Sequence, residues 1–297
     1  MTYLRAMRPE DILLPTPAGL CCRLGGFHID PTRPVDKAVI THGHSDHARP
    51  GHGSVLATHE TLDLMGLRYG GNFAGSMQAA RYGESLNIGG ASVTFHPAGH
   101  VLGSAQVAVA HQGLRIVASG DYKDVADPTC APFELVPCDV FITEATFGLP
   151  VFRHGDADGE IAKLLRSVAL FPERAHLVGA YALGKAQRVI ALIRKAGYTE
   201  PIYLHGALES ITRYYQDRGI ALPLVISDHA DWDGLTAAIK ATGAGKIWVT
   251  HGQEDALVHF CVTHGLEARP LAIVGYGEED EADGAAADSA KASGEAP

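Results

Sequence analysis

Residues 41–47 read Thr-His-Gly-His-Ser-Asp-His, which places three histidines and an aspartate within six residues. They follow residues 37–40, a short apolar run rich in β-branched side chains that predicts a buried strand. The cluster is therefore expected in the loop at the end of a strand. Loops held by rigid strands are suited to hold ligands.

The spacing of the residues in this loop limits the kinds of site that it can form. His42 and His44 lie two residues apart and can point the same way along an extended segment, whereas Asp46 and His47 follow after the chain has turned. One short loop can then serve two neighbouring ions. Imidazole suits zinc, and an aspartate among histidines also admits manganese. The alternative is a polar loop whose histidines only form hydrogen bonds, and the density of ligand-type residues favours the metal site.

Length and composition are those of a globular protein. The 297 residues allow one large α/β domain or two modest ones. No apolar run reaches membrane-spanning length, and residues 1–10 lack the apolar segment of a signal peptide, so no membrane association and a cytoplasmic location are expected. The five cysteines are scattered without CxxC spacing, so the sequence predicts neither a disulfide framework nor a cysteine zinc site.

Charge is distributed unevenly along the chain. The net charge is −10, of which residues 278–297 carry −6 through seven acids and one lysine, so that the other 277 residues carry −4. Such a tail is expected to be disordered. Residues 151–226 instead hold ten Lys and Arg against seven Asp and Glu, a net charge of +3. A basic segment in an acidic protein indicates a surface that meets phosphates.

Three further acidic or histidine residues are predicted at strand ends. Asp30 closes a strand and turn just before the metal loop, where it could orient a liganding histidine or simply cap a turn before proline. His100 follows a strand and a glycine turn, and Asp121 follows another strand. Asp121 is suited to bridge two ions because a carboxylate has two oxygens. Taken alone, His100 or Asp121 would more often be structural.

Periodicity and turn residues predict the remaining elements. The predicted strands are 54–58, 91–95, 104–110, 114–119, 175–178, 201–204 and 246–249. The predicted helices are 59–69, 157–169, 184–196 and one that ends at Gly243. Strands 104–110 and 114–119 should form a hairpin. Alternating helices and strands between 157 and 204 predict an α/β layer there.

The order His42-x-His44-x-Asp46-His47, then His100, then Asp121 resembles the ligand series of the metallo-β-lactamase fold. The resemblance implies an α/β protein built as an αββα sandwich, with the metal site along one edge of its two sheets. Members of this fold include small-molecule hydrolases as well as nucleases, so the fold alone does not decide the function.

Later residues narrow the resemblance. Glu144 at a strand end, His229 ahead of a helix and His251 after strand 246–249 resemble, in this order, the three additional motifs of the β-CASP nucleases. That group contains ribonuclease J and the messenger-RNA 3′-end processing endonuclease. Residues 180–188 also resemble it. From about residue 14 to residue 274 the chain looks most like the bacterial ligase-associated DNA exonucleases.

The domain organisation implied by this resemblance includes a shortened cap. Only 84 residues separate Glu144 from His229, fewer than a full β-CASP cap needs. The expected division is a first part of the metallo-β-lactamase domain (1–148), an abbreviated β-CASP-like cap (149–226), the closing part of the first domain (227–276) and the acidic tail (277–297). Within the cap, Lys185 and Arg188 are expected nearest a phosphate backbone. For most of the other basic residues there, a solvated helix face is the alternative.

The resemblance also implies roles for the site residues in two-metal hydrolysis of a phosphodiester. One divalent ion would be held by His42, His44, His100 and Asp121, and the other by Asp46, His47, Asp121 and His251. Zinc is expected, with manganese as the alternative. His229 would protonate the departing 3′ oxygen, with Glu144 orienting it, and Asp46 completes the catalytic set.

The expected function is that of a DNA exonuclease in DNA repair, acting on single-stranded or end-containing DNA together with a DNA ligase. DNA rather than RNA rests on the resemblance, because no residue visibly recognises a 2′-hydroxyl. An RNA-processing ribonuclease is the first alternative. A small-molecule hydrolase and a catalytically silent scaffold are the others.

Overall fold

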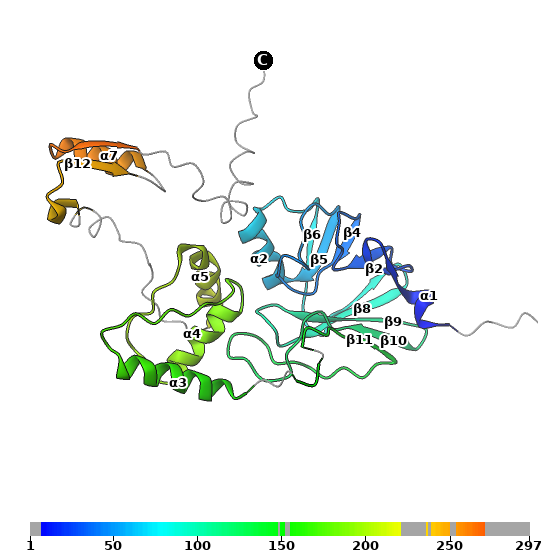
Figure 1. Ribbon diagram of the computed structural model, residues 1–297. Coiled ribbons are helices and arrows are strands. Elements are labelled where there is room, and N and C mark those ends of the chain that lie inside the picture. The colour runs from blue at the N-terminus through cyan, green and yellow to red at the C-terminus, as the bar shows by residue number, and fades with distance from the viewer. Residues whose placement is uncertain are drawn as a thin grey trace, which may run out of the picture. The chain divides into compact units, whose positions relative to one another are not determined.

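The computed structural model describes residues 7–147, 149–151, 155–220, 236, 239–249 and 254–270 (Figure 1). The chain divides into two compact units. The first comprises residues 1–202 with 207–224, and the second comprises residues 203–206 with 225–297. His229, His251 and the acidic tail lie outside the described residues, so the predictions made for them stay predictions.

The first sheet of the larger unit has six strands in sequential order. They are β1 (Leu13–Thr16), β2 (Gly19–Cys22), β3 (Phe27–Ile29), β4 (Lys37–Val39), β5 (Ser54–Thr58) and β6 (Met77–Ala80). A four-residue helix, α1 (Pro9–Ile12), precedes them. The strands from β3 to β6 run parallel, so their carboxyl ends meet at one edge of the sheet.

The second sheet has the order β11-β10-β9-β8-β7. Its strands are β7 (Ser85–Ile88), β8 (Ala91–Pro97), β9 (Ala105–His111), β10 (Leu114–Ala118) and β11 (Val140–Ile142). The predicted hairpin is confirmed, because β9 and β10 pair around Gln112 and Gly113, both at positive φ. Strands β10 and β11 are parallel. Their carboxyl ends therefore also share an edge.

The two sheets share one hydrophobic core. Phe27 and Val39 of the first sheet belong to the same buried cluster as Phe95 and Val107 of the second. Each fully buried side chain of this kind contributes roughly 1.5–3 kcal/mol to stability. Helix α2 (His59–Tyr69) covers the opposite face of the first sheet through Met65 (Figure 1). The described layers are therefore helix, sheet and sheet.

The segment after the second sheet is helical. It contains α3 (Ala157–Leu170), α4 (Lys185–Lys195), a 3-10 turn (Gly206–Leu208) and α5 (Glu209–Asp217). Helices α3 and α4 pack through Ile161, Leu192 and Ile193. The predicted helices 157–169 and 184–196 are confirmed to within a residue at each end.

The strands predicted at 175–178 and 201–204 are wrong. Neither run forms a strand, and the described residues between 155 and 220 contain no sheet. Leu177 is 96% exposed. Such an apolar run satisfies the sequence pattern of a strand, but it lacks a hydrogen-bonded neighbour. The predicted α/β layer is therefore, over the described residues, a set of helices.

The smaller unit contains β12 (Lys246–Val249), α7 (Glu254–Thr263) and β13 (Glu267–Pro270), with the two strands parallel. The strand predicted at 246–249 is confirmed. Residues 239–242 are helical and Gly243 follows at a φ of 63°, which agrees with the predicted helix end. None of the helices in the described part of the chain is long and apolar enough to span a membrane.

Candidate metal centre

The predicted site residues that the structure describes follow the carboxyl ends of five strands. Asp30 follows β3, loop 41–47 follows β4, His100 follows β8, Asp121 follows β10 and Glu144 follows β11. The parallel pairs β3–β4 and β10–β11 bring these ends to a common side of each sheet. Residues scattered over 115 positions of sequence can therefore converge, as ligands at strand ends commonly do.

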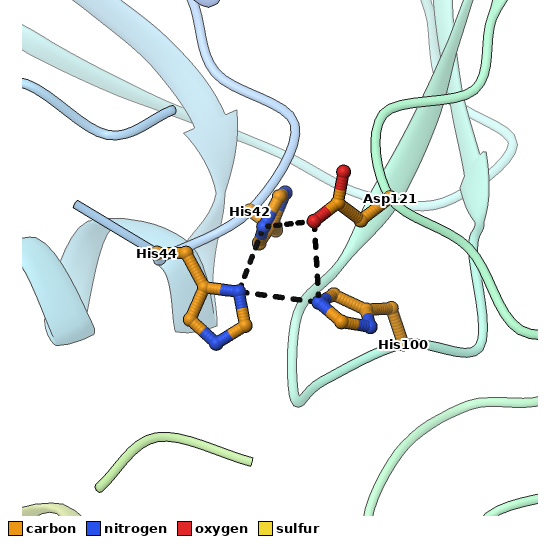
Figure 2. Close-up of side chains that lie close together, drawn as sticks. All are labelled: His42, His44, His100 and Asp121. Atoms are coloured by element: carbon orange, nitrogen blue, oxygen red, sulfur yellow. Dashed lines mark hydrogen bonds and ion pairs between the residues drawn. The ribbon is translucent and has the colours of Figure 1, made fainter. Parts of the chain in front are cut away.

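Four of these residues form a compact cluster: His42, His44, His100 and Asp121 (Figure 2). Nδ1 of His44 lies 3.0 Å from Nε2 of His42 and 3.1 Å from Nε2 of His100. Oδ2 of Asp121 lies 3.6 Å from Nε2 of His42 and 3.7 Å from Nε2 of His100. Ligand atoms bound tetrahedrally to zinc at ~2.1 Å lie roughly 3.4 Å apart. The cluster therefore fits a divalent ion in both donor chemistry and size.

The other carboxylate oxygen of Asp121 belongs to a second group of donors. Oδ1 lies 3.4 Å from Nε2 of His47. The same His47 nitrogen is 3.6 Å from Oδ2 of Asp46. Asp121 thus presents one oxygen to His42 and His100 and the other to His47, which in turn adjoins Asp46. A carboxylate that bridges two ions requires this arrangement.

Asp30 is connected by hydrogen bonds to His47 directly and to His42 through Thr41. Its Oδ2 lies 2.8 Å from Nδ1 of His47 and accepts a 2.6 Å hydrogen bond from the hydroxyl of Thr41. Because that hydroxyl donates to Asp30, it can accept from Nδ1 of His42, 3.1 Å away. The Nε2 lone pair of His42 then faces the cluster. These contacts are compatible with an orienting role for Asp30, which stays a prediction. Thr41 was missed, although its hydroxyl beside the first histidine was visible in the sequence.

Asp30→Asn is expected to weaken zinc binding by about 10–100-fold, because an amide oxygen cannot accept from both His47 and Thr41 as the carboxylate does. Competition with a chromophoric chelator measures the affinity. Asp36→Asn is the matched control, since it removes an exposed carboxylate before β4 that touches neither residue. Equal affinity in the two variants would contradict the role of Asp30.

Burial lowers the pKa of three of the histidines, so that they are neutral, the form in which imidazole can bind a metal ion. Desolvation, reinforced by the neighbouring imidazoles, holds the pKa of His42 well below its usual value. Burial likewise lowers the pKa of His44, and burial together with His44 lowers the pKa of His100 to about 4. These rings are uncharged near neutral pH, which leaves a nitrogen lone pair available on each.

The pKa of His47 is shifted in the opposite direction, upward. Burial alone would lower its pKa, but hydrogen bonds to Asp121 and Asp30 outweigh burial and raise the pKa of His47 to about 10. The same contact lowers the pKa of Asp121. In the metal-free protein His47 and Asp121 therefore form an ion pair. A cation that binds between them must displace the proton of His47.

The metal-free protein is expected to lose stability as the pH falls from about 6.5 to about 4. His42 and His100 have lowered pKa values when folded, so the unfolded chain binds more protons over this range. The raised pKa of His47 affects stability at alkaline pH. The stabilisation that its protonated ring provides is lost as the pH approaches about 10. Thermal melting with chelator present measures both effects. The acid-side loss should be smaller in His100→Asn, and an unchanged profile in that variant would contradict this assignment.

No family model matches the chain. Among curated proteins, it is 28% identical over 205 residues to a protein of Opitutus terrae named probable DNA ligase, covering 67% of this chain and 19% of that one. It is 30% identical over 211 residues to the ribonuclease TTHA0252 of Thermus thermophilus, covering 60% and 48%. It is 28% identical over 217 residues to the endoribonuclease YSH1 of Mycosarcoma maydis, covering 61% and 24%.

The chain is similar, at modest identity, to nucleases of the metallo-β-lactamase/β-CASP family. The resemblance noted in its sequence is thereby confirmed. The chain spans less than half the length of the three relatives named above. A solved structure of an Enterococcus faecalis protein of unknown function aligns with 80% of this chain and 69% of its own, at a TM-score of 0.44 and 13% identity, which is too weak a likeness to establish the fold.

Glu144 is held beside the cluster. Its Oε1 accepts a 3.1 Å hydrogen bond from the backbone amide of Tyr122, the residue after Asp121, and its Oε2 accepts a 3.2 Å bond from the amide of Thr146. The charge of Glu144 also counteracts the lowering of the His100 pKa. The carboxylate is therefore close to the candidate metal ligands, and its direction is fixed by the two backbone amides.

Lys185 and Arg188, the two basic residues of the cap that were predicted to meet phosphate, differ in their surroundings. Lys185 is exposed, and its Nζ lies 5.2 Å from the ring centroid of Tyr181, itself 75% exposed. Arg188 instead places Nε 3.0 Å from Oδ2 of Asp127, whose side chain is 2% exposed. This internal ion pair joins α4 to the loop after Asp121. Lys185 is consequently the better placed of the two to meet a phosphate.

Proposed function

We propose that this chain is a metal-dependent nuclease that hydrolyses phosphodiester bonds with two divalent ions. The observation that carries the proposal is the position of Asp121, with one carboxylate oxygen near His42 and His100 and the other near His47. Similarity to two named ribonucleases supports the same conclusion. A scaffold without activity would not need two adjacent donor groups that share a carboxylate.

The first ion would be held by His42, His44, His100 and Oδ2 of Asp121. The second would be held by Asp46, His47, Oδ1 of Asp121 and, by resemblance, His251. Zinc suits the imidazole-rich first group, and manganese is the alternative where carboxylates contribute more. Bound divalent ions would neutralise charge on the phosphodiester and lower the pKa of an attacking water.

The protein's own residues would handle the proton of the leaving group. We assign to His229 the protonation of the departing 3′ oxygen as the bond from phosphorus to that oxygen breaks. Glu144, fixed by two backbone amides, would orient His229 and favour its protonated form. The products would be a 3′-hydroxyl and a 5′-phosphate. We keep Asp46 in the catalytic set because its exposed carboxylate adjoins His47.

As substrate we propose DNA, cleaved from an end during DNA repair in cooperation with a DNA ligase in the cytoplasm. The similarity to a protein named as a DNA ligase supports this choice. The similarity to two named ribonucleases supports RNA as the runner-up. We also propose that the described helix and sheets are part of an αββα sandwich, with residues 149–226 as its short cap and 227–276 completing it.

Incubation of the protein with end-labelled single-stranded DNA and RNA, with zinc or manganese added, separates these alternatives. Single nucleotides released from DNA would support the first choice. Internal cuts in RNA would support the runner-up. Cleavage of neither nucleic acid by a metal-loaded protein would contradict the proposed function, and turnover of a β-lactam or thioester would then favour a small-molecule hydrolase.

Lys185→Gln is expected to weaken binding of single-stranded nucleic acid and to reduce the slope of log K against log salt by about 0.7–0.9, the value of one phosphate contact. Fluorescence anisotropy at several salt concentrations measures both. Lys195→Gln is the matched control, because Lys195 ends the same helix and is paired with Asp158 at 3.0 Å. Equal losses in the two variants would show that only net charge matters.

A further inference from the structure

One hydrogen bond connects the cap to the metal cluster. Nε2 of His44 lies 3.2 Å from the backbone carbonyl oxygen of Leu183, 139 residues away in the sequence. A carbonyl oxygen can only accept, so Nε2 must carry the hydrogen of the neutral ring. Nδ1 then keeps its lone pair, and it is Nδ1 that faces His42 and His100. The cap thereby fixes which tautomer His44 presents to an ion.

The Leu183 carbonyl also accepts a 3.1 Å hydrogen bond from the amide of Lys185, and the amide on the other side of its peptide is bonded to the side chain of Gln187. This side chain is 0% exposed, and its Oε1 accepts a 2.8 Å hydrogen bond from the backbone amide of Gly184. The amide of Gly184 and the carbonyl of Leu183 belong to one planar trans peptide and point in opposite directions. By binding the amide on one side, Gln187 aims the carbonyl at His44 on the other. Its Nε2 also donates to the carbonyl of Ala182 at 2.9 Å.

The surroundings leave this peptide little freedom. Thr212 on α5 is fully buried and accepts a 2.9 Å hydrogen bond from Nε2 of Gln187. Gly184 has a φ of 85°, and a Cβ at this position would overlap the side chain of Val101, next to His100. Leu183 is buried beside Gly43, next to His44. The segment therefore packs against the chain neighbours of two metal ligands.

We propose that Gln187 is a positioning residue that orients His44 through the peptide between Leu183 and Gly184, so that the packing of the cap determines how tightly the cluster binds an ion. The inference rests on the proposed function, in which His44 is a metal ligand. Gln187 also occupies the N3 position of α4, where a side chain bonded to the residue before the helix is an ordinary capping contact. A capping role alone predicts a change in stability without a selective change in metal affinity.

Gln187→Leu tests the proposal, because leucine fills a similar volume but can neither accept from Gly184 nor donate to Ala182. Zinc affinity, measured by competition with a chromophoric chelator, is expected to fall about 10-fold or more. The absorption spectrum of the cobalt-loaded protein should change as well, since His44 is displaced. Thr212→Val should have a weaker effect in the same direction, and Thr212→Ser, which keeps the hydroxyl, should restore the affinity.

Ile161→Ala provides the matched control. Ile161 lies in the α3–α4 core with Leu192 and Ile193, so its loss loosens the cap in a general way. Urea unfolding and helical circular dichroism compare the stability of the variants. Weakened zinc binding in Gln187→Leu with unchanged binding in Ile161→Ala supports the proposal. Wild-type affinity in Gln187→Leu, or equal losses in both, overturns it. No zinc binding by the unaltered protein would instead contradict the proposed function, and the inference with it.

Discussion

Asp121→Ala is expected to remove bound metal and to reduce cleavage by at least ~10²–10³-fold, the loss typical when a single group that stabilises transition-state charge is deleted. The expected effect is this large because the two carboxylate oxygens face different donor groups, 3.6–3.7 Å from His42 and His100 and 3.4 Å from His47. Without the carboxylate, both groups lose a ligand at once. His47 also loses a partner that raises its pKa.

Elemental analysis of the purified variant gives the number of ions per chain. Asp121→Asn is a useful companion because it keeps the shape of the side chain and one acceptor oxygen while removing the charge. We expect it to retain more metal than Asp121→Ala and to stay well below the unaltered protein in activity. A folded Asp121→Ala variant with two ions and full activity would exclude a bridging role.

His229→Ala is expected to keep both ions and to lose turnover by ~10²–10⁴-fold, the usual contribution of a general acid. This differs from Asp121→Ala, in which metal and activity disappear together. A substrate with p-nitrophenolate as the leaving group provides a sharper test, because that group departs without protonation. The variant should cleave it at close to the normal rate.

His111→Ala is the control for this experiment, since His111 lies at the hairpin between β9 and β10 and its ring nitrogen contacts the carbonyl of Gly90. It should leave both metal content and turnover unchanged. Loss of an ion from His229→Ala would show that His229 is a ligand instead of an acid. Equal loss of activity on both kinds of leaving group would exclude proton donation.

Helices and strands could be predicted from the sequence where their own capping residues and their own buried face determine them. Helix α2 begins after Thr58, whose hydroxyl accepts from the amide of Thr61, and it ends at Gly70 at a φ of 80°, so both boundaries were visible in the sequence. The runs at 175–178 and 201–204 have the composition of strands. Whether such a run pairs depends on a neighbouring strand elsewhere in the chain, which a single segment cannot reveal.

The convergence of the ligands was also predictable, because Asp30, His100 and Asp121 each end a strand in the sequence pattern. The contacts that support the ligands were harder to find. The contact between Leu183 and His44 is made by a backbone carbonyl. Every residue has such a carbonyl, so the type of residue at position 183 does not reveal the contact. Lys185 and Arg188 look equivalent in sequence, and only the buried Asp127 distinguishes them by pairing with Arg188.

Metal-dependent cleavage after chelation is the most direct test of the central claim, that two adjacent donor groups bind divalent ions that cut a nucleic-acid backbone. The protein is stripped with a chelator, and zinc or manganese is then returned in steps while end-labelled DNA and RNA are assayed. We predict no cleavage by the stripped protein and full recovery at two ions per chain. Cleavage that persists after chelation, or a protein loaded with two ions that cuts neither nucleic acid, would contradict the claim.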